Sequence, residues 1–222
     1  MKITRIIILA GSLGLTQESM AVAKNWASVR ILAPANNAQL ARLKHYGSVP
    51  EFSFVERSGK KTSLAELRGK VWIADFIYTN CTDTCPLQTA DMAKLQERWI
   101  NESDLELVSF SIDPERDTPR VLSQYAGRFK ADAKRWLFLT GGKEEIARLV
   151  EDGFRLAAAP APNTKNRTGI ILHSARFVLV DRKTQIRGYY DSRNPEALQR
   201  LKNDVATLLK EKSDAAEEVR PF

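Results

Sequence analysis

A nearly continuous apolar run, residues 71–78, constrains the fold of this 222-residue chain more than any other feature. The run has neither the alternation of a half-exposed strand nor the period of an amphipathic helix. It is typical of a strand buried on both faces of a sheet. Asp75 is the one charged residue inside the run, so its carboxyl group must be paired, neutralised or turned to an exposed position. A strand of this kind requires a covering layer on each side of its sheet.

Strands and helices alternate along the rest of the chain. The sequence predicts strands at 52–55, 71–78, 105–112, 136–139, 176–180 and 185–190, and helices over 86–99, from 119, around 146–150 and from 195. Alternating units imply a parallel sheet with right-handed crossovers, and the last two strands, joined by a tight turn at 181–184, add an antiparallel pair. This order predicts an α/β protein with a thioredoxin-like three-layer α/β/α fold and a mixed central sheet.

The chain divides into four predicted segments. Residues 1–23 combine a positive start, a short apolar run at 6–15 and a small-x-small site at 21–23, which predicts an export signal or an N-terminal anchor. The apolar run is shorter than the ~20 residues that span a bilayer. Residues 24–46 are predicted to be a spacer, 47–210 the thioredoxin-like domain and 211–222 a charged tail. We therefore expect an exported protein, periplasmic or membrane-associated and facing the periplasm.

The net charge of the chain is +7. A basic surface favours acidic protein partners or anionic lipid headgroups, so association with a membrane surface is compatible with this charge. The sequence has no dense Lys/Arg run interleaved with aromatic residues, and we do not expect a nucleic-acid partner.

The two cysteines of the chain, Cys81 and Cys85, fall where the buried strand turns into a helix. They can be a redox pair, two metal ligands or a structural disulfide. A disulfide over so short a loop restricts the unfolded chain little, which makes a purely structural role unattractive. The free N–H groups and the dipole of a helix N-terminus lower a thiol pKa, and Cys85 is expected to benefit most. Outside the cytoplasm the pair can be oxidised.

A metal site at this turn would need further ligands. The chain has two histidines, and His173 lies just before a predicted strand, whereas His45 lies in the predicted spacer. Two thiolates and one imidazole form a soft, three-coordinate set that favours copper, above all Cu(I). Zinc usually takes a fourth protein ligand in a closed structural site.

Five segments of the chain resemble the Sco/SenC family of copper-binding, thioredoxin-fold proteins, which take part in cytochrome c oxidase assembly. They are residues 69–71, 78–86, 113–119, 139–141 and 173–181, within a similarity that extends from about residue 47 to residue 209. The most specific of them are Cys81 to Cys85-Pro86, the Asp-Pro-Glu-Arg-Asp-Thr-Pro segment that starts at Asp113, and the late His173.

The resemblance implies that Cys81, Cys85 and His173 bind copper, as Cu(I) and Cu(II). It implies a metallochaperone that supplies copper to the dinuclear copper centre of cytochrome c oxidase, or reduces that centre, with the copper-bearing subunit or another copper or thiol acceptor as partner. Asp113 and Asp117 match acidic positions of the family that are thought to support the site or partner contacts. A turn and a helix cap are the alternative roles, and we favour the cap for Asp117.

The chain departs from the family pattern at two positions. Thr82 stands where the family commonly has proline, and it should leave the turn more mobile because proline would fix φ. Asp75 stands where the family tends to have apolar residues, and its charge is expected to affect the site.

Two other functions compete with copper transfer. In a thiol-disulfide oxidoreductase, Cys81, expected to be the more exposed thiol, would attack and Cys85 would resolve the mixed disulfide, keeping the acceptor cysteines reduced. In a peroxidase of the peroxiredoxin type, Thr82-x-x-Cys85 would be part of the motif, but Tyr78 stands where that motif expects proline.

Overall fold

A computed structural model describes residues 43–82, 84–156 and 175–217, the side chains of 212–217 excepted. These residues belong to one compact unit that begins at Leu43. The predictions for residues 1–42 lie outside the described residues.

A seven-stranded mixed sheet forms the middle of this unit, in the order β2-β1-β5-β4-β3-β6-β7. Its strands are β1 (Ser53–Glu56), β2 (Lys61–Ser63), β3 (Val71–Ile77), β4 (Leu105–Ser111), β5 (Trp136–Thr140), β6 (Arg176–Val180) and β7 (Ile186–Asp191). Strands β3, β4 and β5 are parallel, and the remaining neighbours pair antiparallel. The central β3 is buried along its whole length, as its apolar sequence predicts.

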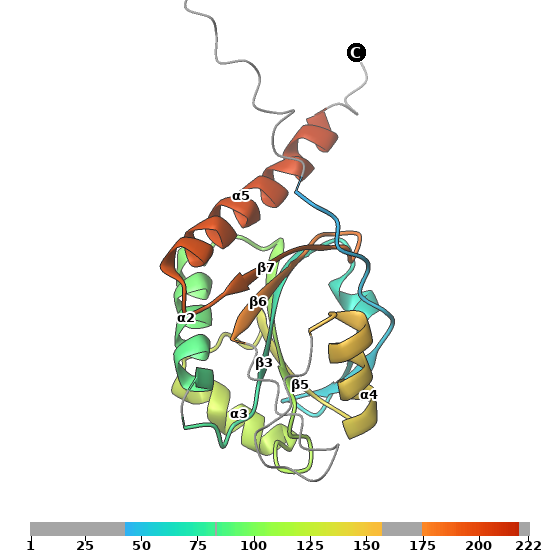
Figure 1. The fold of residues 1–222 in the computed structure, drawn as a ribbon, viewed down its shortest axis with the longest axis vertical. Helices are drawn as coiled ribbons and strands as arrows, with labels where there is room; N and C mark the ends of the chain where they lie inside the picture. Colours follow the sequence, from blue (N-terminus) through green and yellow to red (C-terminus); the bar gives the residue numbers. More distant parts are fainter. Residues whose placement is uncertain (1–42, 83, 157–174, 218–222) are drawn as a thin grey trace, which may run out of the picture. The chain divides into compact units, whose positions relative to one another are not determined.

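Helices cover both faces of the sheet (Figure 1). One face carries α2 (Thr84–Arg98), α3 (Pro119–Arg128) and α5 (Pro195–Glu217). The other carries the 3-10 turn η3 (Leu64–Leu67), α4 (Lys143–Arg148) and the π-helical turn η4 (Leu149–Gly153). The three-layer α/β/α arrangement with a mixed sheet is confirmed.

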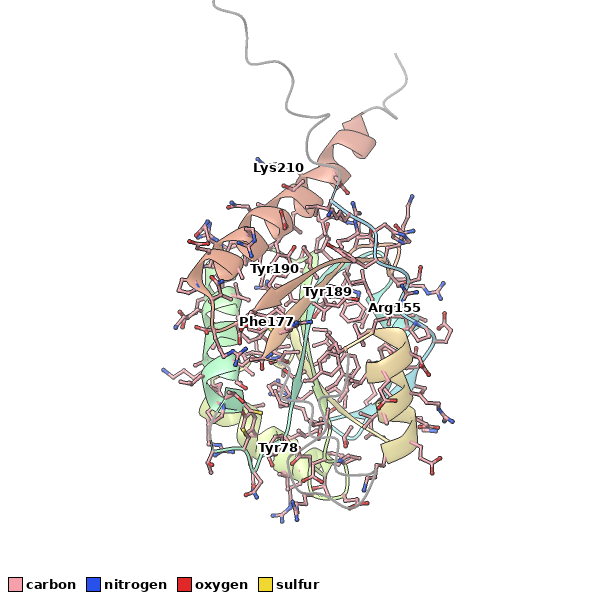
Figure 2. All side chains as sticks on the ribbon, in the orientation of Figure 1. Tyr78, Arg155, Phe177, Tyr189, Tyr190 and Lys210 are labelled. Atoms are coloured by element: carbon pink, nitrogen blue, oxygen red, sulfur yellow. The ribbon has the colours of Figure 1, made fainter. Side chains whose placement is uncertain are left out.

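The residues of β3 divide the core between the two faces. Val71, Ile73 and Ile77 pack with α2, α3 and α5, whereas Trp72 and the other even-numbered residues pack with η3 and α4. Neighbouring tyrosines of β7 show the same alternation (Figure 2): the Tyr190 hydroxyl donates to Asp204 of α5 over 2.6 Å, and the Tyr189 hydroxyl donates to the Phe154 carbonyl over 2.9 Å on the opposite face.

Most element boundaries agree with the sequence to within two residues, and three features differ. Strand β2 is not predicted, because its three residues are too few to show a period. Residues 43–46, predicted as the end of a spacer, lie against β7, where the Tyr46 amide donates to the Ile186 carbonyl over 2.9 Å. Helix α5 continues past Lys210 into the predicted tail.

Candidate functional site

The two cysteines lie side by side at the carboxyl end of β3. Cys81 is in the turn after the strand, and Cys85 is in the first turn of α2. The backbone N–H of Cys85 donates to Cys81 Sγ over 3.4 Å, and neither cysteine is in a disulfide. Cys81 is 8% and Cys85 6% exposed, so Cys81 is the more exposed cysteine, as expected, but only by a small margin, and both are buried. In Figure 2, Tyr78 marks this end of the sheet.

The pKa of Cys85 is shifted in the direction opposite to the one predicted from the sequence. Burial raises the pKa of the Cys85 thiol to about 12, although a hydrogen bond with the Tyr78 backbone favours the thiolate. Cys81 and Asp75 raise that pKa further. The prediction of a lowered pKa is therefore wrong, because desolvation outweighs the helix N-terminus. Since the Cys85 amide donates to Cys81 Sγ, the helix end stabilises negative charge on Cys81 instead.

Asp117 holds the backbone just before the cysteines. Its carboxylate is fully buried and accepts hydrogen bonds from the Thr79 amide over 3.0 Å, the Thr79 hydroxyl over 2.5 Å and the Ser111 hydroxyl over 2.7 Å. The N-cap of α3 is Thr118, whose hydroxyl accepts from the Val121 amide, so the prediction that Asp117 caps this helix is wrong. Asp117 instead connects Thr79, in the turn before Cys81, with Ser111 at the end of β4.

Asp113 lies at the start of the same loop. Its amide donates to the Ser111 hydroxyl over 3.1 Å, and its carboxylate accepts from Arg116 over 3.2 Å. The carboxylate does not reach the cysteine turn through any hydrogen bond within the described part of the chain. Its predicted alternative role in a turn fits these contacts.

We expect Asp117→Ala to lower the free energy of unfolding by about 2–4 kcal/mol, because it leaves the Thr79 and Ser111 donors buried without an acceptor. Asp113→Ala is the matched control and should cost no more than about 1 kcal/mol, since it removes an exposed ion pair. Urea unfolding of both variants measures the difference. Equal losses would show that Asp117 does not anchor the turn.

The first turn of α2 is attached to its neighbours from two sides. The Thr89 hydroxyl donates to the Cys85 carbonyl over 2.8 Å and is hydrogen-bonded to the Tyr125 hydroxyl of α3, also over 2.8 Å. The Gln88 side chain donates to the Arg176 carbonyl over 3.2 Å. This second bond joins α2 to the first residue of β6.

The described residues contain no complete set of metal ligands around the cysteine pair. Among the residues described, no group of three or more His, Cys, Asp or Glu could hold a metal ion. His173 lies outside them, two positions before Ala175, where the description resumes. Because β6 runs antiparallel to β3 and Gln88 contacts Arg176, the chain enters β6 at the end of the sheet that carries the cysteines.

His45 lies at the opposite end of the sheet. It is exposed, and the neighbouring Tyr46 pairs with Ile186, the first residue of β7. Ile186 is opposite Val180, which pairs with Trp72 near the start of β3. This position excludes His45 from a site at the cysteine turn of the same chain.

Several polar residues that support the site were not identified from the sequence. Ser109 and Ser111 lie in β4, whose residues are all buried, and Thr89 and Tyr125 form the bond between α2 and α3. A serine inside a fully buried strand indicates that its hydroxyl has a hydrogen-bond partner, and Ser109 and Ser111 could have been recognised on this ground. The Ser111 hydroxyl donates to the Asp117 carboxylate, and the Ser109 hydroxyl accepts from the Trp136 indole over 2.9 Å.

Sequence comparison identifies the family of this chain. The SCO1/SenC family profile matches residues 41–210. The chain belongs to the SCO1/SenC family. A SCO1 protein homolog of Bacillus subtilis is 38% identical to it over 134 residues, which cover 60% of this chain and 67% of the relative.

Solved structures of SCO1/SenC proteins have the same thioredoxin-like fold. BsSco, described as a cytochrome c oxidase assembly protein with a disulfide switch, is 32% identical, with a TM-score of 0.63 over 76% of this chain and 98% of its own. Bradyrhizobium japonicum ScoI, solved with copper bound, is 27% identical, with a TM-score of 0.57 over 70% of this chain and 98% of its own.

Among the described helices of the present protein, none is both long and apolar enough to cross a membrane.

Proposed function

We propose that this protein is a copper carrier that helps to mature the dinuclear copper centre of cytochrome c oxidase. Copper is its cargo, held between the thiolates of Cys81 and Cys85 and the imidazole of His173. The observation that carries the proposal is the pair of thiols placed side by side in one turn, with the Cys85 amide on Cys81 Sγ. The relatives fit this role: ScoI of Bradyrhizobium japonicum binds copper, and BsSco is a cytochrome c oxidase assembly protein.

The donor set suits copper and its transfer. Thiolates are soft ligands that select Cu(I), and one imidazole adds a ligand that Cu(II) also accepts. A site with three protein ligands leaves room for a thiol of the acceptor, so copper can pass through a shared intermediate. Asp117 supports this site by holding the Thr79 backbone two residues before Cys81.

His173→Ala is expected to weaken Cu(I) and Cu(II) binding by the reduced protein at least about tenfold, because it removes one of three ligands. His45→Ala is the matched control, since His45 is exposed at the other end of the sheet and should leave binding unchanged. Competition with a copper chelator of known affinity measures both variants.

Two results would contradict the three-ligand site. His173→Ala could bind copper as tightly as the parent, which would leave only the thiols as ligands. His45→Ala could weaken binding as much as His173→Ala, which would place the third ligand elsewhere.

The thiol pair also supports a second function, thiol-disulfide exchange that keeps the acceptor cysteines reduced. Cys81 and Cys85 are close enough for the Cys85 amide to reach Cys81 Sγ, which favours closure of a disulfide between them. BsSco is described as having a disulfide switch, and the same chemistry fits this chain. Exchange would not require His173, so a His173→Ala variant with unchanged exchange rates distinguishes the two functions.

We further propose where the protein works and with what. Its predicted export segment, residues 1–23, fits a site of action outside the cytoplasm, soluble or on the membrane surface, with 47–210 as the functional domain. The partner is a copper-accepting or thiol-bearing protein, of which the copper-bearing oxidase subunit is the expected example. The basic charge of +7 favours an acidic partner surface.

A further inference from the structure

The domain has a second end, opposite to the cysteine turn. The loops at this end precede β5, β4 and β3 or join β6 to β7, and these five strands are neighbours in the sheet, in the order β5-β4-β3-β6-β7. In Figure 2, Lys210 of α5 lies towards this end and Tyr78 lies at the cysteine end. We call this end the distal surface, and its segments are residues 43–46, 68–70, 97–106, 130–135, 181–187 and 208–211.

Hydrogen bonds join the segments of the distal surface. The Arg135 guanidinium donates to the carbonyls of Trp99 and Ile100, over 2.5 Å in each case. The Gly69 amide donates to the Arg182 carbonyl over 2.9 Å. Because Arg135 holds two consecutive carbonyls, it fixes the loop that carries Ile100 and joins it to the loop before β5.

Apolar side chains are exposed on the distal surface. Among the described residues, three large apolar side chains are exposed: Tyr46 at 39%, Leu87 at 69% and Ile100 at 66%. Tyr46 and Ile100 belong to the distal surface. Trp99, beside Ile100, is half-buried, and the Arg98 guanidinium lies 5.3 Å from the centre of its ring. Aromatic side chains next to an aliphatic one and to basic residues are typical of a surface that meets the headgroup region of a bilayer.

The distal surface is also basic. Its segments carry eleven basic and seven acidic side chains. The described segments at the cysteine end carry five of each, and they are residues 78–82, 112–120, 140–143, 175–176 and 191–196. Four exposed lysines of the distal surface form no ion pair within the described part of the chain: Lys44, Lys130, Lys134 and Lys183. Exposed basic residues beside exposed apolar ones favour an anionic lipid surface over a neutral one.

The part of the chain outside the described residues joins the domain at this same end. The description begins at Leu43, which packs against the same apolar cluster as Trp99 and Leu209. Residues 1–42 include the predicted export or anchor segment, residues 1–23. A retained anchor would therefore be connected to the distal surface and not to the cysteine turn.

We propose that the distal surface docks on the anionic headgroups of a membrane, with Ile100, Trp99 and Tyr46 at the lipid interface and the exposed lysines on the phosphates. The cysteine turn then faces away from the bilayer. It is separated from the lipid by at least the length of β3, whose seven residues span about 20 Å. This inference goes beyond the proposed copper function and does not depend on it.

Hydrogen–deuterium exchange of the full-length protein on lipid vesicles tests the proposal, with a metal chelator present. Vesicles of phosphatidylcholine alone are compared with vesicles that contain about one third phosphatidylglycerol. On the anionic vesicles, the amides of 97–106 and 130–135 should exchange at least about threefold more slowly than on the neutral ones, and those of 78–82 should be unchanged. The slowing should disappear when salt is raised to about 0.5 M, because salt screens the lysines from the headgroups.

Two triple variants distinguish the position of the charges from their number. The first removes three charges from the distal surface and should abolish most of the slowing: Lys130→Gln, Lys134→Gln and Lys183→Gln. The control removes the same number of exposed charges at the cysteine end and should retain the slowing: Arg116→Gln, Arg120→Gln and Arg193→Gln.

A second pair of variants tests the apolar contact. Ile100→Ser should reduce the slowing on anionic vesicles at least about twofold, because it removes apolar area from the interface. Leu87→Ser is the matched control, since Leu87 is as exposed as Ile100 but lies beside the cysteines, and it should behave like the parent.

Equal exchange on the two kinds of vesicle would overturn the proposal, as would slowing at the cysteine turn in place of the distal surface. Equal losses in the two triple variants would show that only the total charge matters, which also contradicts it. Slowing by soluble polyglutamate without slowing by anionic vesicles would assign the distal surface to an acidic protein instead of a membrane. Because copper is excluded, each of these results leaves the carrier function to be judged by its own titrations.

Discussion

Asp75→Asn is expected to stabilise the folded protein above pH 7 and to leave its stability near pH 4 almost unchanged. The pKa of Asp75 is raised in the folded state, from 3.8 to about 7, because the carboxyl group is buried. The neutral acid is therefore the form that the folded state tolerates. Its contribution to stability is fully present below pH 3.8 and is lost as pH rises towards and through 7.

The size of this effect follows from the same two pKa values. Their difference corresponds to about 4 kcal/mol of unfolding free energy at alkaline pH. Asparagine has nearly the same shape and no charge, so the variant should escape most of this loss. Urea unfolding of parent and variant at pH 4, 6, 7.5 and 9 measures it.

Glu106→Gln is the control for this effect, because Glu106 is also a buried acid of the sheet. Glu106→Gln should gain less stability at high pH than Asp75→Asn, because Lys70 offsets part of the burial that raises the pKa of Glu106. An Asp75→Asn variant that is destabilised equally at every pH would show that the Asp75 carboxylate is not a buried, uncompensated charge. A gain confined to high pH would show that the folded protein carries an uncompensated buried carboxylate at that pH.

Replacing either cysteine by serine is expected to weaken Cu(I) binding at least about a hundredfold. The loss of an outer-shell partner alone costs 10- to 100-fold in typical metal sites, and a lost thiolate ligand should cost more. Serine keeps the shape of the side chain but offers a hard oxygen in place of the soft sulfur that Cu(I) prefers. Chelator competition on Cys81→Ser and Cys85→Ser measures the loss.

Thr82→Ala provides the control for these variants, since Thr82 is exposed in the same turn and is not a proposed ligand. It should bind copper like the parent. If one of the two serine variants also bound like the parent, the two sulfurs could not both be ligands. Because the Cys85 thiol is protonated at neutral pH, copper must displace its proton, and binding to the parent should strengthen as pH rises.

Much of the fold could be predicted from local patterns. Residues 71–77 are apolar at almost every position, and this can be recognised without knowing what covers them. The cap of α5 was predictable as well, because Asn194 before Pro195 is a local signal, and its side chain accepts from the amides of Glu196 and Ala197. Strand β2 was not predictable, since only its pairing with β1 defines its three residues.

The place of the two cysteines in the fold was predictable from the sequence, whereas the pKa of Cys85 was not. The turn between a buried strand and a helix is visible in the sequence around Cys81 and Cys85. The pKa of Cys85 depends on how deeply tertiary packing buries the thiol, and here burial exceeds the effect of the helix end. The role of Asp117 depends on Thr79, 38 residues earlier in the chain, and no local pattern reports such a contact.

The most direct test of the carrier function is a Cu(I) titration of the parent protein in its reduced and its disulfide forms, without any substitution. The carrier function predicts one tightly bound copper per reduced chain and none per oxidised chain, because oxidation removes both thiolate ligands at once. Equal binding by the two forms would contradict it, since copper would then be held without Cys81 and Cys85.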